Sequence, residues 1–127
     1  MIEVRVPLPG DRSYPVLVGR GVATELAAHL SGTGLPPVGR AAVVTQEGIP
    51  VSVEPGVAHR VFTIPDGESA KTLSTIEELC RSFADWGLTR GDVVVGVGGG
   101  VVTDVAGFAA ASYHRGVPVV HVATTLL

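Results

Sequence analysis

Three consecutive glycines, Gly98-Gly99-Gly100, constrain the fold of this chain more than any other feature of its sequence. They follow the apolar run 93–97 and precede a segment of helical pattern at 101–112. A short, continuously apolar run is typical of a strand that is buried in a parallel sheet. The triplet therefore predicts a tight turn that joins a buried strand to a helix, as in doubly wound α/β proteins.

The rest of the chain alternates strand and helix patterns in the same way. Alternating residues predict a hairpin or a pair of edge strands at 2–6 and 14–18. The expected buried strands are 41–44, 61–64, 93–97 and 117–122. The expected helices are 21–30, 69–86 and 101–112, with loops at 31–39 and 46–56. We expect one domain over residues 1–127, with a Rossmann-like, doubly wound and mostly parallel sheet.

The helix at 69–86 has the clearest pattern. Gly87 is expected to end it, since glycine adopts the left-handed conformation that closes a helix. Apolar residues recur at helical spacing along one side of this segment. They predict a buried face that consists of Leu73, Ile76, Leu79, Cys80, Phe83 and Trp86.

Composition narrows the class of protein. A net charge of −3 offers no basic surface, so nucleic acid is not an expected partner. No signal peptide or membrane-spanning run is visible, and the single cysteine, Cys80, excludes a disulfide framework, so we expect a cytoplasmic protein. The four histidines lack metal-ligand spacing and are interpreted as structural or surface residues.

The glycine turn is a candidate phosphate site. Glycines let backbone N–H groups approach an anion closely, and the following helix directs its positive dipole end toward that anion. Asp104 is expected in the first turn of this helix, where it would cap N–H groups or accept a ribose hydroxyl. The alternative is a plain tight turn in which Asp104 only begins the helix, because the pattern is not GxGxxG.

Two further segments end predicted strands and so belong to the edge of the sheet where ligands collect. In Asp66-Gly67-Glu68-Ser69-Ala70-Lys71, Glu68 could accept hydroxyls and Lys71 could neutralise a phosphate, although a simple helix start fits equally. Thr124 and Thr125 could bind a ribose or an amide, or only terminate a strand. Arg115 follows a helix, and its plain role would be to bind the last carbonyls.

Taken in order, these motifs resemble the 3-dehydroquinate synthase family. The matching runs are Asp66-Gly-Glu-Ser-Ala-Lys71, Gly98-Gly-Gly-Val-Val-Thr-Asp104, Val105-Ala-Gly-Phe-Ala-Ala-Ala-Ser-Tyr113, Arg115-Gly116 and Thr124-Thr-Leu-Leu127. Glycerol dehydrogenases and iron-dependent alcohol dehydrogenases share the glycine triplet with its aspartate. The run Asp66–Lys71 and the runs Arg115-Gly116 and Thr124–Leu127 are more specific to one family, and they narrow the resemblance to sugar-phosphate cyclases.

The resemblance implies an NAD-binding α/β domain, followed in the family by a mostly helical domain that carries zinc or cobalt. It also implies a homodimer and a reaction of the shikimate pathway, in which 3-deoxy-D-arabino-heptulosonate 7-phosphate becomes 3-dehydroquinate and phosphate. The metal ligands and most substrate-binding residues of the family would follow Leu127, so we expect this chain to be inactive alone, with neither catalytic nor metal residues of its own.

Carried over by position, the family's cofactor contacts fall on three segments of this chain. Arg115 matches a position that reaches the phosphate of a substrate bound to this subunit or its neighbour. The residues expected to contact NAD are Asp66, Gly67, Glu68, Lys71, Gly98, Gly99, Gly100, Val101, Val102, Thr103, Asp104, Thr124 and Thr125.

This chain departs from the family where the adenosine ribose is held. There the family usually has an acidic or amide pair, and this chain has Gln46 and Gly48. Two alternatives to the synthase remain open. One is a related cyclase of natural-product biosynthesis that acts on sedoheptulose 7-phosphate or glucose 6-phosphate. The other is a fragment that binds a dinucleotide and is not an enzyme.

Overall fold

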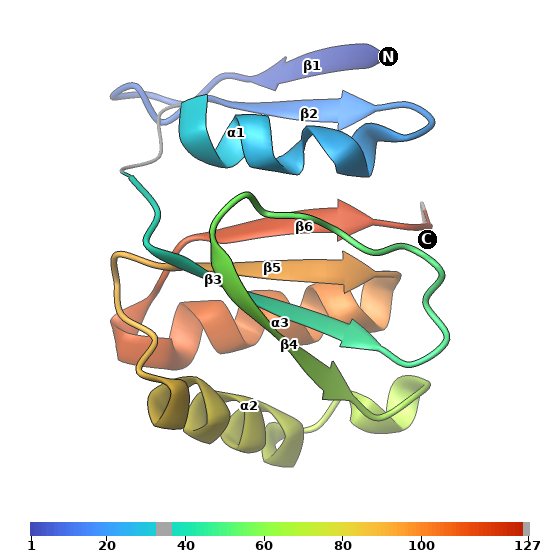
Figure 1. The fold of residues 1–127 in the computed structure, drawn as a ribbon, viewed down its shortest axis with the longest axis vertical. Coiled ribbons are helices and arrows are strands. Elements are labelled where there is room, and N and C mark those ends of the chain that lie inside the picture. The colour runs from blue at the N-terminus through green and yellow to red at the C-terminus, as the bar shows by residue number, and fades with distance from the viewer. Residues whose placement is uncertain (33–36, 126–127) are drawn as a thin grey trace.

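A four-stranded parallel sheet forms the centre of the computed structural model, which describes residues 1–32 and 37–125 (Figure 1). Its strands lie in the order β4-β3-β5-β6. The chain forms β3 and β4 on one side of the sheet and then crosses to form β5 and β6 on the other side of β3. The strands are β3 (Arg40–Gln46), β4 (Ala58–Ile64), β5 (Val93–Gly98) and β6 (Val119–Ala123). This arrangement confirms the predicted doubly wound α/β fold, because adjacent strands are parallel and connected by crossovers.

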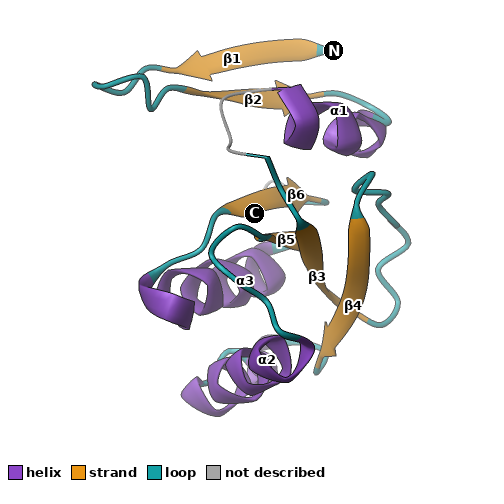
Figure 2. Cartoon of the chain, turned by 60° about the vertical axis from the view of Figure 1, so that its left-hand side comes forward, coloured by secondary structure: helices purple, strands orange, loops and turns teal. Residues whose placement is uncertain are grey.

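Helices cover one face of this sheet, and mixed structure covers the other. α2 (Leu73–Trp86) and α3 (Gly100–Ser112) pack on the first face, as Figure 2 shows. On the second face, α1 (Leu26–Gly32) packs together with apolar residues of the segment 47–57. Short 3-10 turns complete the order, at η1 (Val22–Glu25), η2 (Glu68–Ala70) and η3 (Tyr113–Arg115).

The two central strands are buried because both of their faces are covered. Every residue of β5 is buried, and Val43 of β3 lies beside Val95 of β5. Continuously apolar strands are stable here because neither face meets water. Strand prediction at 41–44 and 93–97 was therefore correct, although both strands extend one or two residues further.

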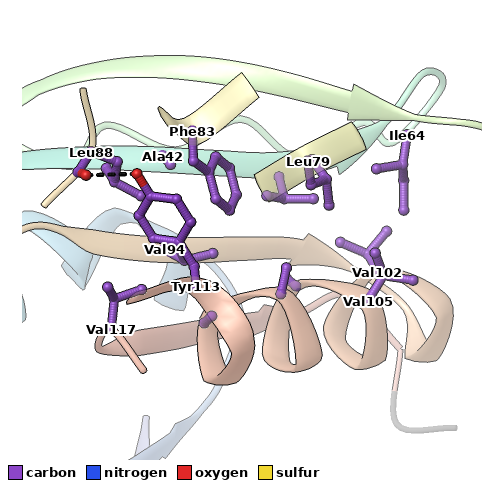
Figure 3. Close-up of a cluster of buried hydrophobic side chains, with 14 of the residues drawn as sticks. Ala42, Ile64, Leu79, Phe83, Leu88, Val94, Val102, Val105, Tyr113 and Val117 are labelled. Carbon is purple, nitrogen blue, oxygen red and sulfur yellow. Dashed lines mark hydrogen bonds between the residues drawn. The ribbon is translucent and has the colours of Figure 1, made fainter. Parts of the chain in front are cut away.

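Buried apolar side chains fill the core between the sheet and helices α2 and α3, and Phe83 and Tyr113 lie among them (Figure 3). The Phe83 ring meets Phe62 edge-on at 5.1 Å and Tyr113 edge-on at 5.6 Å between centroids. The Tyr113 hydroxyl donates a 2.8 Å hydrogen bond to the Leu88 carbonyl, which satisfies the one polar atom of this ring inside the core. Burial raises the pKa of the Tyr113 hydroxyl, so it remains a donor.

The start of α2 corrects the sequence prediction. Ser69 lies in η2 and not in the helix, because Thr72 is extended and its hydroxyl caps the N–H of Thr75 at 3.1 Å. The predicted buried face is otherwise confirmed, because Leu79 and Phe83 are buried. Ile76, Cys80 and Trp86 are partly buried against the same core, whereas Leu73 is 76% exposed. Gly87 ends the helix in the left-handed conformation, as predicted.

Other boundaries also shift. The expected helix 21–30 is a 3-10 turn followed by α1, and β4 begins at Ala58 instead of Val61. β6 begins at Val119, because the N–H of the buried Val117 bonds instead to the Ala110 carbonyl at the end of α3. Part of the loop expected at 31–39, and the pair Leu126-Leu127, lie outside the described residues.

A buried carboxylate ties the amino ends of β3 and β5 together. Asp92 accepts the backbone N–H of Arg40 at 2.8 Å and that of Thr89 at 2.7 Å. The Arg40 guanidinium lies over the Trp86 ring at 4.3 Å and donates to the last carbonyls of α2. Asp92 and Arg40 thereby join α2 to the sheet at the edge opposite the glycine turn.

The predicted hairpin forms a two-stranded sheet of its own. β1 (Ile2–Val6) and β2 (Tyr14–Val18) pair antiparallel, with Val4 opposite Val16. It lies beyond α1, at the end of the molecule away from α2 (Figures 1 and 2). Among the described helices, none is long and apolar enough to cross a membrane.

Candidate functional site

The glycine turn joins β5 to α3 by a very close approach. Gly98 has φ +155°, and a Cβ there would lie 2.6 Å from Val102 Cγ2. A Cβ on Gly96, two residues earlier in β5, would lie 2.9 Å from the Ala106 Cβ. Glycine at these positions therefore allows α3 to lie directly against β5, with its N-terminus at the carboxyl end of the strand.

The glycine turn leaves α3 without a side-chain cap from its own N-cap residue. This residue is Gly99, which has no side chain to accept the first N–H groups, and α3 begins with Gly100. Among residues 1–32 and 37–125, no heavy atom would lie within 4 Å of a Cβ on Gly100, so these residues leave the space beside it open. An uncapped helix start with open space beside it can receive an anion such as a phosphate.

The segment after β6 lies against the same turn. The Thr124 N–H donates a 2.9 Å hydrogen bond to the Gly98 carbonyl. A Cβ on Gly99 would lie 3.0 Å from the Thr125 hydroxyl, so this hydroxyl is next to the turn. The structure thus brings the two threonines and the glycine triplet together, as expected from the carboxyl ends of neighbouring parallel strands.

The segment after β4 reaches the same helix through an ion pair. Lys71 Nζ lies 2.7 Å from Asp104 Oδ2. The hydrogen bond to Asp104, and then the charges of Asp104 and Glu68, raise the pKa of Lys71, so it stays protonated. Sequence analysis singled out both residues separately, and the structure joins them beside the start of α3.

The position of Asp104 corrects one prediction. α3 begins at Gly100, which places Asp104 in its second turn, so it cannot cap the first N–H groups of the helix. Its carboxylate instead binds Lys71 and remains 58% exposed. A carboxylate held in this way can accept a hydroxyl group of a ligand while Lys71 balances its charge.

A carboxylate that sequence analysis missed lies at the end of β3. Glu47 lines an open hollow of about 370 Å³ together with Asp66, at the carboxyl ends of β3 and β4. The Gln46 amide donates a 2.8 Å hydrogen bond to the carbonyl of Pro65, which lines the same hollow. Glu47 could have been predicted from its place in the sequence, because it directly follows a buried parallel strand.

Arg115 is not brought to this site. α3 runs from the carboxyl edge of the sheet to the opposite edge, where Arg115 follows it in η3 with φ +65°. The neighbouring His114 carbonyl accepts a hydrogen bond from Arg90 at 2.8 Å. Within residues 1–32 and 37–125, Arg115 bonds none of the helix carbonyls expected as its partners, and it lies apart from the glycine turn.

His121 lies against β5 and α3, close to the candidate site. Its ring packs over two glycines, so that a Cβ on Gly96 would lie 3.3 Å from Nδ1 and one on Gly107 would lie 3.4 Å from Cε1. Burial lowers the pKa of His121, and the charge of Asp104 partly opposes that shift. In the described part of the chain, no cluster of three or more His, Cys, Asp or Glu side chains could hold a metal ion.

Comparison with known proteins identifies the family to which this arrangement belongs. A family model described as 3-dehydroquinate synthase N-terminal matches residues 61–127. The chain belongs to this family. The matched range contains every residue that sequence analysis expected to contact NAD, whereas Glu47 precedes it.

Curated relatives match nearly the whole chain. One, provisionally named an aminodehydroquinate synthase, is from Amycolatopsis mediterranei and is 50% identical over 92% of this chain and 32% of its own length. The 3-dehydroquinate synthase of Rhodococcus opacus is 42% identical over 98% of this chain and 34% of its own length. The chain spans about a third of the length of such relatives.

Solved structures of sugar-phosphate cyclases share the fold. A 2-deoxy-scyllo-inosose synthase superimposes with a TM-score of 0.79 at 26% identity, over 98% of this chain and 36% of that protein. Another structure of this enzyme contains carbaglucose-6-phosphate, NAD+ and Co2+, with a TM-score of 0.77 at 25% identity. A 2-epi-5-epi-valiolone synthase from Streptomyces hygroscopicus, with NAD+ and Zn2+ bound, has a TM-score of 0.72 at 28% identity, and the chain covers 36% of it.

Proposed function

We propose that these 127 residues provide the NAD-binding part of a 3-dehydroquinate synthase. The observation that carries this proposal is the meeting of three separate segments at one edge of the sheet, around an uncapped helix start. NAD+ bound in two solved members of the same fold supports the choice of ligand.

In this proposal each segment binds a different part of NAD. The backbone of Gly98 to Val101 receives the pyrophosphate, because no Cβ or cap occupies the space beside it. Lys71 supplies positive charge, while Glu68 and Asp104 accept hydroxyl groups. Thr124 and Thr125 contact the dinucleotide from the end of β6, and Asp66, Gly67, Val102 and Thr103 complete the lining.

Glu47 is proposed as the acceptor for the adenosine ribose. Gln46 and Gly48 do not supply the expected pair, because the Gln46 amide binds Pro65 and Gly48 has no side chain. Glu47 lies between them in sequence and lines the hollow at the carboxyl ends of β3 and β4. A carboxylate can accept both ribose hydroxyls, which is its usual role in dinucleotide sites.

The reaction proposed for the complete protein eliminates phosphate from 3-deoxy-D-arabino-heptulosonate 7-phosphate. When bound, NAD would accept hydride from a ring hydroxyl and would return it later in the same cycle. The residues described here hold and orient NAD so that it stays bound through the cycle. Arg115 is proposed to reach a substrate phosphate, and its place on the opposite edge favours a substrate bound to a neighbouring subunit.

A divalent metal is proposed for the complete protein, because solved relatives contain Co2+ or Zn2+. The described residues do not fit such an ion, since no suitable cluster of ligands occurs among them. No step of the proposed binding therefore depends on a metal held by this part of the chain.

A second candidate function is supported by one comparison. The relative from Amycolatopsis mediterranei, named for an amino form of dehydroquinate, is 50% identical, compared with 42% for a 3-dehydroquinate synthase. The substrate would then carry an amino group, and the NAD site would be unchanged.

Phosphate release by the complete protein separates these possibilities. We expect release from 3-deoxy-D-arabino-heptulosonate 7-phosphate and much slower release from its amino analogue. Faster release from the amino analogue would favour the second candidate. Release from neither substrate, with NAD and a divalent metal present, would contradict both.

A further inference from the structure

The turn that follows α3 has an unusual backbone. His114 has φ +50° and Arg115 has φ +65°, so two consecutive residues with side chains adopt the left-handed conformation. Residues that carry a Cβ avoid this conformation, which costs free energy unless the surrounding structure imposes it. Strained residues of this kind occur mainly at ligand-binding and active sites, so the turn calls for a functional explanation.

The loop 88–92 holds this turn in place. Arg90 Nε donates a 2.8 Å hydrogen bond to the carbonyl of His114. The Tyr113 ring packs against the His114 ring at 4.2 Å between centroids, and the Tyr113 hydroxyl is bonded to the Leu88 carbonyl (Figure 3). One loop therefore holds both the residue before the strained pair and the carbonyl that joins the two members of the pair.

The backbone of this loop is itself fixed on both sides of Arg90. Asp92 Oδ2 accepts the N–H of Thr89 at 2.7 Å and the Thr89 hydroxyl at 3.1 Å. The Gly91 carbonyl accepts the N–H of Gly39 at 3.0 Å, which ties the loop to the segment before β3. The Arg90 side chain therefore extends from an anchored backbone, so its bond to the turn is a bond to a rigid support.

The charge of Arg115 is not balanced by any of residues 1–32 and 37–125. Ion pairs between these residues involve Arg40, His59, Lys71 and Arg81, and none of them involves Arg115, which is exposed. The turn thus combines a backbone that is held firmly with a guanidinium that has no bonding partner among the described residues. A guanidinium with its donors available is suited to binding a phosphate, because its planar pair of N–H groups matches two phosphate oxygens.

We propose that Arg90 is a positioning residue for the substrate phosphate. Its bond to the His114 carbonyl fixes the peptide between His114 and Arg115, so the backbone that carries the Arg115 side chain is in place before the phosphate binds. Less conformational freedom is then lost on binding, and the affinity for the phosphate rises. Arg90 itself does not touch the substrate. This inference rests on the proposed function, in which Arg115 reaches that phosphate.

Two substitutions separate the hydrogen bond of Arg90 from its charge. In Arg90→Gln the amide nitrogen takes the place of Nε along the side chain, so the donor is kept and the charge is lost. In Arg90→Met a methyl group takes that place, so the donor and the charge are both lost. A positioning role predicts that the first variant behaves like the unaltered protein and that the second does not.

Kinetics of the complete protein, with NAD and a divalent metal present, test this role. We expect Arg90→Met to raise the KM for the sugar phosphate, and the inhibition constant for inorganic phosphate, by about threefold to tenfold each, with kcat changed by less than about twofold. Arg90→Gln should change neither constant by more than about twofold. The affinity for NAD should be the same in all three proteins, because the glycine turn lies at the other edge of the sheet. A general disturbance of the fold would change it.

A double substitution shows whether Arg90 acts through Arg115. We expect Arg115→Ala to raise the KM by about tenfold or more, and the addition of Arg90→Met to change it by less than about twofold. Additive effects would overturn the proposal, and so would equal losses in Arg90→Gln and Arg90→Met, because the charge of Arg90 would then act on the substrate directly.

The two proposals fail in different ways. An unchanged KM in Arg115→Ala would contradict the role proposed for Arg115, and this inference with it. A raised KM in Arg115→Ala together with an unchanged KM in Arg90→Met would overturn this inference alone.

Discussion

Gly98 has a conformation and a surrounding that no other residue fits. Its φ of +155° disfavours a side chain, and a Cβ would lie 2.6 Å from Val102 Cγ2. We therefore expect Gly98→Ala to lower the free energy of unfolding by about 2–4 kcal/mol, measured by urea denaturation.

Gly100→Ala is the matched control in the same turn. No atom of the described residues lies within 4 Å of a Cβ at that position, so the free energy of unfolding of this variant should change by less than about 1 kcal/mol. Equal effects of the two substitutions would show that the close approach of α3 to β5 is not what requires glycine.

The charge state of His121 depends on its neighbours. Burial lowers its pKa from the usual 6.5, and Asp104 opposes this shift. We expect Asp104→Asn to lower the pKa of His121 further, as followed by NMR titration of the ring. A pKa that rises in this variant would contradict the account.

The lowered pKa of His121 also makes the free energy of unfolding depend on pH. Because the pKa of His121 is lower in the folded chain, the unfolded chain binds the proton first as pH falls. The contribution of the neutral ring is therefore complete above pH 6.5 and is lost progressively below it.

At the scale of elements, Asp92 joins β3, β5 and the end of α2. Its two oxygens accept N–H groups of Arg40 and Thr89 inside the protein. Asp92→Asn replaces one acceptor with a donor, and we expect the free energy of unfolding to fall by about 2 kcal/mol. The exposed Asp85→Asn is the control, with an expected change below about 0.5 kcal/mol. A similar loss in both variants would contradict this role of Asp92.

The elements were predictable where local pattern decides structure. The apolar runs at 93–97 and 41–44 are strands because both faces are covered, and Gly87 ends a helix because of its own conformation. The start of α2 was not predictable in the same way. Ser69 and Thr72 are both reasonable caps, and only the backbone after Gly67 decides between them.

The site was predictable in outline and not in its contacts. The segments at Lys71, Gly98 and Thr124 could be assigned to one edge because they follow parallel strands. The Lys71–Asp104 ion pair depends on how η2 packs against α3. The local sequence of either segment does not predict that packing. Asp92 was missed because a single carboxylate in a glycine-containing loop resembles ordinary surface.

At the scale of the whole molecule, the described chain combines a four-stranded parallel sheet with an open hollow at the carboxyl ends of β3 and β4. The Lys71–Asp104 pair is exposed, and an exposed ion pair contributes little to the stability of the fold. Its position beside an uncapped helix start is better explained by a ligand than by stability. We propose that this ligand is NAD.

Calorimetric titration of the chain with NAD tests that claim most directly. We expect one NAD per chain, and about tenfold weaker binding for Lys71→Ala, since a charge-assisted contact to phosphate is lost. Arg81→Ala removes a comparable exposed ion pair on α2, with Glu77, and should leave NAD binding unchanged. No heat at millimolar NAD, or equal weakening by both substitutions, would contradict the account.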